Sequence, residues 1–314
     1  MEPYTSDQFN RCRQQVTPYI HRTPVLRSSQ LDSLSGSHLY FKCENFQRAG
    51  SYKIRGATNA LLGLLEQGPV PAVVTHSSGN FAQALSLAAR NMGVPAYIVM
   101  PSNAPEVKKE GVRAYGGQIR ECEPTLEARE REAERVRLET GALFIHPSND
   151  PMVMLGQGTA CAELLEDVPG LHCVVAPVGG GGLLGGTSLA AAFSGTGCEP
   201  IGAEPRMVDD AYRSLKSGRI EGNTRTDTVA DGLRTVLGSH TFPVLSRHVK
   251  TIVRVEESEI LRAMRLVWER MKIIIEPSSA VAVAAVLKEP GRFGNREVGI
   301  LISGGNVDLG RLPF

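Results

Sequence analysis

Four consecutive glycines, Gly179 to Gly182, form the most unusual local pattern in this sequence of 314 residues. They follow an apolar run at 173–178 that predicts a buried strand, and an apolar helical pattern begins directly after them at Leu183. A glycine loop between a strand and a helix presents backbone N–H groups and the positive end of the helix dipole to a phosphate. Four glycines also lose so much conformational entropy on folding that an ordinary turn explains them poorly. The loop therefore predicts a phosphate-binding site.

Two kinds of phosphate ligand fit this loop. Gly180, Gly182 and Gly185 match the spacing of the dinucleotide fingerprint, and Glu204 lies about 20 residues further on, where that fingerprint places an acidic residue. A dinucleotide-binding loop usually opens its domain, whereas this loop lies in the middle of the chain. No Lys-Ser or Lys-Thr pair follows it, which excludes the mononucleotide P-loop. An NAD-binding oxidoreductase is thus one alternative.

Three further polar segments carry groups that can do chemistry. Segment 50–57 (GSYKIRGA) places Lys53 beside Tyr52 and ahead of an apolar helical pattern, which is typical of a Schiff-base lysine next to a ring. Segment 75–80 (THSSGN) ends a strand and begins a helix, so its N–H groups and hydroxyls can hold a carboxylate. Segment 303–306 (SGGN) follows another predicted strand. Each of these three segments has an ordinary explanation, as a solvated lysine, a helix cap or a turn. The glycine loop and the three segments together, in this order, form a highly specific pattern.

The elements that must position these segments alternate between strands and helices. Predicted strands cover residues 38–43, 72–76, 96–100, 118–121, 143–146, 173–178, 200–203, 251–255 and 298–303, and predicted helices cover 81–92, 127–140, 151–166, 256–271 and 278–287. This alternation predicts an α/β protein with twisted, mostly parallel sheets flanked by helices. We expect residues 72–149 to form a small domain and residues 1–71 and 150–314 a large one, with the ligand between them.

Composition excludes several classes of protein. With 34 Lys and Arg against 33 Asp and Glu, the net charge of +1 gives no electrostatic reason to expect nucleic acid or an anionic membrane as a partner. The first residues are polar, and no apolar run is long enough to span a membrane. The six cysteines show no zinc spacing and indicate small buried side chains in a reducing compartment. We therefore expect a soluble, cytoplasmic protein.

The four segments, in this order, resemble those of the fold-type II pyridoxal-phosphate (PLP) enzymes, in the serine racemase and serine/threonine dehydratase branch. The resemblance runs from 21–25 (HRTPV) through 41–44 (FKCE) to 303–308 (SGGNVD). It is strongest toward the racemases at 96–99 (AYIV), 267–272 (VWERMK) and 275–277 (IEP). It implies a two-domain fold like that of the tryptophan synthase β chain, PLP as cofactor and a homodimer.

The resemblance also implies a role for each residue of the site. Lys53 would form the Schiff base, Asn80 would bond the ring oxygen of the cofactor, and Ser303 the ring nitrogen. A serine cannot hold that nitrogen protonated as an aspartate would, which suits β-elimination through a short-lived carbanion. The cofactor-binding residues are then Tyr52, Lys53, Asn80, Gly179, Gly180, Gly181, Gly182, Leu183, Gly232 and Ser303. The substrate-binding residues are Ser77, Ser78, Asn80, Phe81, Arg129 and Thr235.

Two features of the resemblance concern a metal and the substrate. Glu204, Asp210 and the carbonyl of Val208 match a divalent-metal site, and such oxygen ligands suit Mg²⁺ or Ca²⁺. Without the resemblance, both acids read as helix-entry and surface residues. The family usually has histidine where this chain has Phe81. Because an apolar ring replaces a hydrogen-bond donor there, we expect threonine or phenylserine to be preferred over serine, and to be ahead of 3-hydroxyaspartate, which Arg129 could still receive.

The activity that the resemblance implies is that of a PLP-dependent ammonia-lyase. Lys53 would remove the Cα proton of an L-β-hydroxy amino acid, the β-hydroxyl would leave, and a 2-oxo acid and ammonia would result. An amino-acid racemase is the nearest alternative, because Ser78 matches the residue that serves the opposite face of the carbanion. A ligand-sensing relative without catalysis is another.

Overall fold

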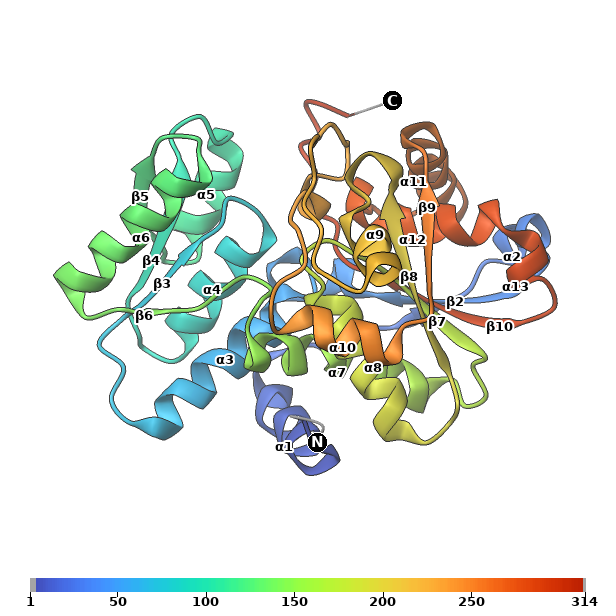
Figure 1. The fold of residues 1–314 in the computed structure, drawn as a ribbon, viewed down its shortest axis with the longest axis horizontal. Coiled ribbons are helices and arrows are strands. Elements are labelled where there is room, and N and C mark those ends of the chain that lie inside the picture. Colours follow the sequence, from blue (N-terminus) through green and yellow to red (C-terminus); the bar gives the residue numbers. More distant parts are fainter. Residues whose placement is uncertain (1–3, 313–314) are drawn as a thin grey trace.

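The computed structural model describes residues 4–312 and contains two β-sheets flanked by helices (Figure 1). The larger sheet has the strand order β1-β2-β10-β7-β8-β9, and the smaller has the order β5-β4-β3-β6. Every neighbouring pair is parallel except β1 with β2, as the α/β prediction requires. The strands are β1 (Val25–Leu26), β2 (His38–Cys43), β3 (Val73–His76), β4 (Ala96–Pro101), β5 (Gln118–Cys122), β6 (Leu143–Phe144), β7 (Cys173–Pro177), β8 (Glu199–Pro205), β9 (Thr251–Val255) and β10 (Glu297–Ile302).

All nine predicted strands are present, and their ends differ from the prediction by at most two residues. Strand β1 was not predicted, because two residues are too few to show an alternating pattern. The α-helices are α1 (Ser6–Val16), α2 (Ser29–Ser35), α3 (Lys53–Gln67), α4 (Asn80–Asn91), α5 (Glu106–Ala114), α6 (Leu126–Thr140), α7 (Pro151–Asp167), α8 (Gly182–Ser194), α9 (Asp210–Ser217), α10 (Thr241–His248), α11 (Glu257–Met271), α12 (Pro277–Lys288) and α13 (Pro290–Phe293).

Local sequence explains where the principal elements begin and end. Every residue of β7 is buried, as expected for a central parallel strand with helices on both faces. The side chain of Thr125 accepts the backbone N–H of Ala128 and so caps α6, which ends at Gly141 in the left-handed conformation. Asp150 caps α7 in the same way, ahead of a proline at the first helical position.

Helices α3, α7 and α8 pack with their backbones in contact. A Cβ atom at Gly156 of α7 would lie 2.6 Å from the carbonyl oxygen of Arg55 in α3. A Cβ at Gly186 of α8 would lie 2.3 Å from the carbonyl oxygen of Met154 in α7. Only glycine permits this approach. The contact fixes the first residue of α3, Lys53, relative to the glycine loop at the start of α8.

A buried ion cluster beneath α3 also fixes this helix. The guanidinium of Arg55, fully buried, bonds Glu44 through Nε at 2.7 Å and Glu163 through Nη1 at 2.7 Å. Glu163 is also 2.7 Å from the buried ammonium of Lys42 on β2. Buried carboxylates with cationic partners and hydrogen bonds avoid most of the penalty of burial, and removing one partner is strongly destabilising. We attribute a structural role to this cluster.

Figure 1 shows the smaller sheet with α4, α5 and α6 as one lobe, and the larger sheet with most of the remaining chain as the other. The strands of the smaller sheet all lie between Val73 and Phe144. The domain boundaries at 71/72 and 149/150 stay a prediction. Within residues 4–312, none of the helices has the length and apolar character needed to cross a membrane.

Candidate active site

The Lys53 side chain, at the start of α3, lies close to two aromatic rings. Its Nζ is 5.1 Å from the ring centre of Tyr52 and 5.8 Å from that of Phe81, and it donates a hydrogen bond to the carbonyl oxygen of Pro147 at 3.0 Å. Burial lowers the pKa of this amine to about 8, although the negative charge of Glu276 opposes the shift. An amine that loses its proton near neutrality can act as a base or a nucleophile.

The glycine loop forms a cradle that side chains would fill. Gly181 has φ +83°, and a Cβ at Gly180 would lie 2.2 Å from the Oγ of Ser148. A Cβ at Gly179 would lie 3.2 Å from both the Gly232 carbonyl oxygen and the Thr235 Oγ1. The loop leads into α8 at Gly182, whose first turn contains the buried Leu183, so backbone N–H groups without helix partners face this region. Hydroxyls, N–H groups and a helix N-terminus fit a phosphate.

Ser303 directly follows β10 and belongs to a compact hydroxyl pair. Its Oγ lies 2.9 Å from that of Ser279, which donates to the Gly304 carbonyl oxygen and accepts the Gly304 N–H. The carbonyl oxygen of Ser303 accepts the backbone N–H of Tyr52, so β10 directly supports the residue before Lys53. The structure thereby brings Ser303 next to Tyr52, the residue before Lys53, and the roles of these residues toward the cofactor stay predictions.

The segment between β3 and α4 brings polar groups to the carboxyl end of β3. Ser77, Ser78 and Asn80 are half-buried there, and the Ser77 Oγ accepts the Gly79 N–H at 3.4 Å. Phe81, the next residue, is only 2% exposed, so its ring packs in the core with one face toward Lys53. That the Phe81 ring contacts the substrate stays a prediction.

Arg129 lies in the first turn of α6 and is half-buried. Its Nε donates to the carbonyl oxygen of Thr125 at 3.3 Å, and within residues 4–312 no carboxylate pairs with it. The pKa of His76, at the end of β3, is lowered mainly by burial and also by the charge of Arg129. A guanidinium without a carboxylate partner therefore lies near the segment that carries the serines.

The two predicted metal-ligating acids lie together in the interior. Glu204 and Asp210 are both fully buried, and Glu204 accepts the backbone N–H groups of Ala211 and Tyr212 at 3.0 Å each. Burial, and next the charge of Asp210, raises the pKa of Glu204 well above its usual value. Burial likewise raises the pKa of Asp210 to about 6. Two adjacent buried carboxylates, with the carbonyl of the buried Val208 close by in sequence, are a donor set that fits a hard divalent cation.

Several residues at the site were not predicted from the sequence. Glu276, immediately before α12, is 5% exposed and accepts hydrogen bonds from Asn80. His146 accepts the backbone N–H groups of Ser148 and Asn149 at Nδ1, and burial lowers its pKa to about 4, so it is a neutral ring with its proton on Nε2. The sequence signal for Glu276 was its place before a proline, which reads as an ordinary helix start.

The opposite pKa shifts of Glu276 and Lys53 predict how stability depends on pH. Burial raises the pKa of Glu276 to about 7, so between pH 4.5 and 7 the folded chain holds a proton that the unfolded chain has lost. The free energy of unfolding therefore falls as pH rises from 4.5 to 7. The pKa of Lys53 is lowered from 10.5 to about 8, so between these values the unfolded chain holds a proton that the folded chain has lost, and the free energy of unfolding rises from pH 8 to 10.5.

We therefore expect the unfolding temperature of the cofactor-free protein to fall toward pH 7 and to rise above pH 8. Differential scanning fluorimetry from pH 5 to 10 checks this expectation. Glu276→Gln should reduce the fall of the unfolding temperature toward pH 7, and Lys53→Met should reduce its rise above pH 8. If both variants keep the pH dependence of wild type, neither group titrates as described.

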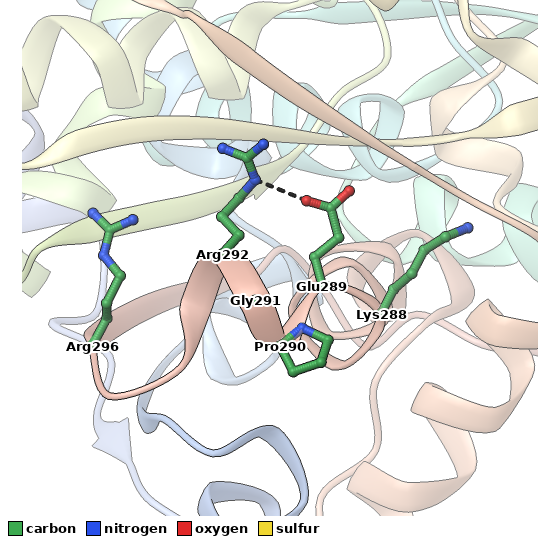
Figure 2. A pocket seen from close by; sticks show the side chains of 6 residues that line it. All are labelled: Lys288, Glu289, Pro290, Gly291, Arg292 and Arg296. Carbon is green, nitrogen blue, oxygen red and sulfur yellow. Dashed lines mark hydrogen bonds and ion pairs between the residues drawn. The ribbon is translucent and has the colours of Figure 1, made fainter.

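A surface hollow near the amino ends of β8 and β10 has no comparable chemistry (Figure 2). Its lining residues are Lys288, Glu289, Pro290, Gly291, Arg292 and Arg296. Arg292 pairs with Glu289 at 2.8 Å, Lys288 with Glu259 at 2.8 Å, and Arg296 with Glu199 at 3.5 Å. Since its cations already have carboxylate partners, we assign no anion site there.

Comparison with known proteins identifies the family. The family model described as "Pyridoxal-phosphate dependent enzyme" matches residues 16–304. This chain belongs to that family. The PLP-dependent assignment replaces the dinucleotide interpretation of the glycine loop, and the resemblance inferred from the four segments is confirmed.

Individual relatives of this PLP-dependent enzyme span its whole length. It is 47% identical over 310 residues to the beta-hydroxyaspartate dehydratase of Paracoccus denitrificans (strain Pd 1222), covering 99% of this chain and 98% of that protein. The crystal structure of serine racemase from Dictyostelium discoideum has a TM-score of 0.92 and 46% identity, covering 97% and 99%. The crystal structure of a threonine deaminase from T.th. has a TM-score of 0.90 and 42% identity, covering 96% and 98%. The predicted fold-type II architecture is thereby confirmed.

Proposed function

We propose that this PLP-dependent enzyme is a dehydratase that converts an L-β-hydroxy amino acid into a 2-oxo acid and ammonia. The observation that carries the proposal is the Lys53 amine, which lies near two aromatic rings and bonds Pro147, the residue before the Ser148 that lines the glycine cradle. The similarity to a dehydratase and a deaminase over nearly the whole chain supports it. Release of ammonia and 2-oxo acid from serine, threonine, phenylserine and 3-hydroxyaspartate tests it, and a protein that releases neither from any of them is not this dehydratase.

Each part of the site has a task in this reaction. Bound PLP supplies the electron sink that stabilises negative charge at Cα. The backbone N–H groups of Gly179 to Gly182 and of Leu183 would hold its phosphate, and the backbone of Gly232 would lie beside its ring. Lys53 removes the Cα proton, and its lowered pKa leaves part of the amine neutral near pH 7. Ser77 and the N-terminus of α4 hold the substrate carboxylate.

Racemisation is a second candidate activity, supported by Ser78. A racemase needs a proton-transferring group on each face of the planar carbanion, and Lys53 serves only one. The half-buried hydroxyl of Ser78 lies in the same segment as the other substrate-binding groups, and several curated relatives are named serine racemases. We propose that racemisation, where it occurs, is secondary to dehydration.

Phe81 and Arg129 are proposed to set the substrate preference in opposite directions. Phe81 places an apolar ring beside the reacting amine and favours threonine or phenylserine over serine. Arg129, a guanidinium without a carboxylate partner among residues 4–312, suits a second carboxylate such as that of 3-hydroxyaspartate. The name of the Paracoccus relative supports including that substrate.

Phe81→His should raise kcat/KM for serine relative to threonine by about fourfold, since the extra methyl group of threonine loses about 0.8 kcal/mol of apolar contact with the ring. Steady-state kinetics on the four substrates, for wild type and variant, measures this ratio. Phe81→Leu keeps an apolar side chain and should leave the preference for threonine in place. If serine is already the best substrate of wild type, or Phe81→His leaves the order unchanged, the role given to Phe81 is wrong.

We further propose that Glu204, Asp210 and the Val208 carbonyl bind Mg²⁺ or Ca²⁺. Chelator should then lower the unfolding temperature by about 5 °C, and either ion should restore it, because a ligand of the native state stabilises that state. Asp209→Asn changes a neighbouring carboxylate that pairs instead with Arg213 and Arg254, so this control should keep the response. No response to chelator, together with a harmless Glu204→Ala, would leave no basis for the site.

A homodimer in the cytoplasm is the expected state of this enzyme. Six cysteines without disulfide partners agree with a reducing compartment, and the dimer follows from the family resemblance alone. Sedimentation analysis of the holoenzyme measures the number of subunits.

A further inference from the structure

A chain of hydrogen bonds links four distant segments beside Lys53. The Asn306 Nδ2 donates to the carbonyl oxygen of Ala49 at 2.9 Å and to the Oδ1 of Asn80 at 2.9 Å. The Asn80 Nδ2 in turn lies 2.9 and 3.0 Å from the two carboxylate oxygens of Glu276. This series of hydrogen bonds runs from the loop before α3, through the loop after β10 and the start of α4, to the residue before α12.

The hydrogen bond between Asn306 and the Ala49 carbonyl determines the direction of the other hydrogen bonds in this series. A backbone carbonyl only accepts, so the amide nitrogen of Asn306 must face Ala49. The second N–H of that nitrogen then meets Asn80, whose facing atom must be the oxygen. The nitrogen of Asn80 consequently faces Glu276, which accepts. The Asn80 side chain is thus held in one of its two flip states.

This arrangement leaves one donor of Asn80 unassigned. A nitrogen at nearly equal distances from both carboxylate oxygens can serve both with a single N–H that lies between them. Asn80 carries two such protons, and among residues 4–312 its nitrogen has no acceptor other than Glu276. The second N–H is therefore available to a ligand at the half-buried start of α4.

Glu276 differs from the structural carboxylates of this protein. Glu44 and Glu163 are buried with Arg55 as an ion partner, whereas no Lys or Arg among residues 4–312 lies within 4.0 Å of Glu276. Lys53, Lys108 and Asp231 are the charged groups near enough to influence it, and Lys108 is itself paired with Asp231. A buried carboxylate without a cationic partner is costly to the fold, which points to a role in the site.

We propose that Glu276 is a positioning residue, which fixes the Asn80 amide so that its remaining N–H is presented to the cofactor. This inference rests on the proposed function, in which Asn80 bonds the ring oxygen of PLP. Glu276 acts only through Asn80, and Asn306 secures the same orientation from the other side.

A double-mutant cycle on PLP binding tests the proposal. The dissociation constant for PLP is measured on the cofactor-free protein, and the visible absorption band on the holoenzyme, for wild type, Glu276→Ala, Asn80→Ala and the double variant. Glu276→Ala should weaken PLP binding about tenfold and shift the band, and should add nothing further in the Asn80→Ala background. Glu276→Gln, which retains one acceptor oxygen, should be intermediate.

Two further variants separate positioning from general damage. Asn306→Asp, equal in size, removes both donors of Asn306 and should weaken PLP binding as Glu276→Ala does. Asp32→Ala removes a carboxylate that accepts the backbone N–H of Leu39 near the start of β2. This variant should leave PLP binding unchanged. Unfolding temperatures of all cofactor-free variants identify any that fail to fold.

Four outcomes would overturn the inference. Additive losses from Glu276→Ala and Asn80→Ala would show that Glu276 does not act through Asn80, and an unchanged dissociation constant and band in Glu276→Ala would show that it positions nothing. If Asn80→Ala itself binds PLP normally, or wild type binds none, the proposed function of the site fails as well. The first two results leave that function intact, so the two failures are distinguishable.

Discussion

Lys53→Ala is expected to lower kcat by about 10⁴-fold, because the amine that lies near the Tyr52 and Phe81 rings, and that is proposed to remove the Cα proton, is lost. The fold should persist, since among residues 4–312 Nζ makes a single hydrogen bond, to the Pro147 carbonyl oxygen. Borohydride reduction of the wild-type holoenzyme, followed by peptide mapping, should find the pyridoxyl group on Lys53.

The matched control for this prediction is Lys288→Ala. Lys288 lies in the surface hollow near the amino ends of β8 and β10 and should be dispensable for turnover (Figure 2). A pyridoxyl group mapped to any other lysine would contradict the assignment of Lys53, and so would a Lys53→Ala variant with normal turnover.

Ser78→Ala should reduce racemisation by about 10²–10⁴-fold while elimination from the L-substrate changes little. The physical reason is that only racemisation needs a proton delivered to the face opposite Lys53. Chiral chromatography of the remaining amino acid and an assay of the 2-oxo acid measure the two reactions in the same sample.

Ser77→Ala is the control for Ser78, because it is proposed to bind the substrate carboxylate and should raise KM for both reactions. Equal losses of both activities in Ser78→Ala would remove its special role. If wild type forms no D-amino acid, the racemase alternative is dropped and the dehydratase proposal stands.

The sequence predicted the parts of this site that have a local signature. Four glycines after a fully apolar strand are recognisable without any tertiary information, and β7 with the loop at Gly179 to Gly182 lies where that pattern places it. Lys53 was predicted from its flanking aromatic and small residues together with the family resemblance, and its role stays a prediction. The order of the sheets was not predicted, because register between strands depends on contacts that no local pattern records.

Glu276 illustrates what local patterns cannot show. It bonds Asn80 across 196 positions of the chain, and its own neighbourhood, an acid before a proline at a helix start, is typical of an ordinary cap. Ser148 was missed for a similar reason, because its closeness to Gly180 arises only when β6 and β7 are folded into separate sheets. The proximity of Phe81 to Lys53 likewise depends on the contact between α3 and α4.

Proton NMR of the holoenzyme with its best L-β-hydroxy amino acid, combined with an ammonia assay, tests the dehydratase proposal most directly. The proposal predicts 2-oxo acid and ammonia in a ratio of one to one, with the D-enantiomer at most a minor product. A D-amino acid as the main product, without 2-oxo acid, would contradict it.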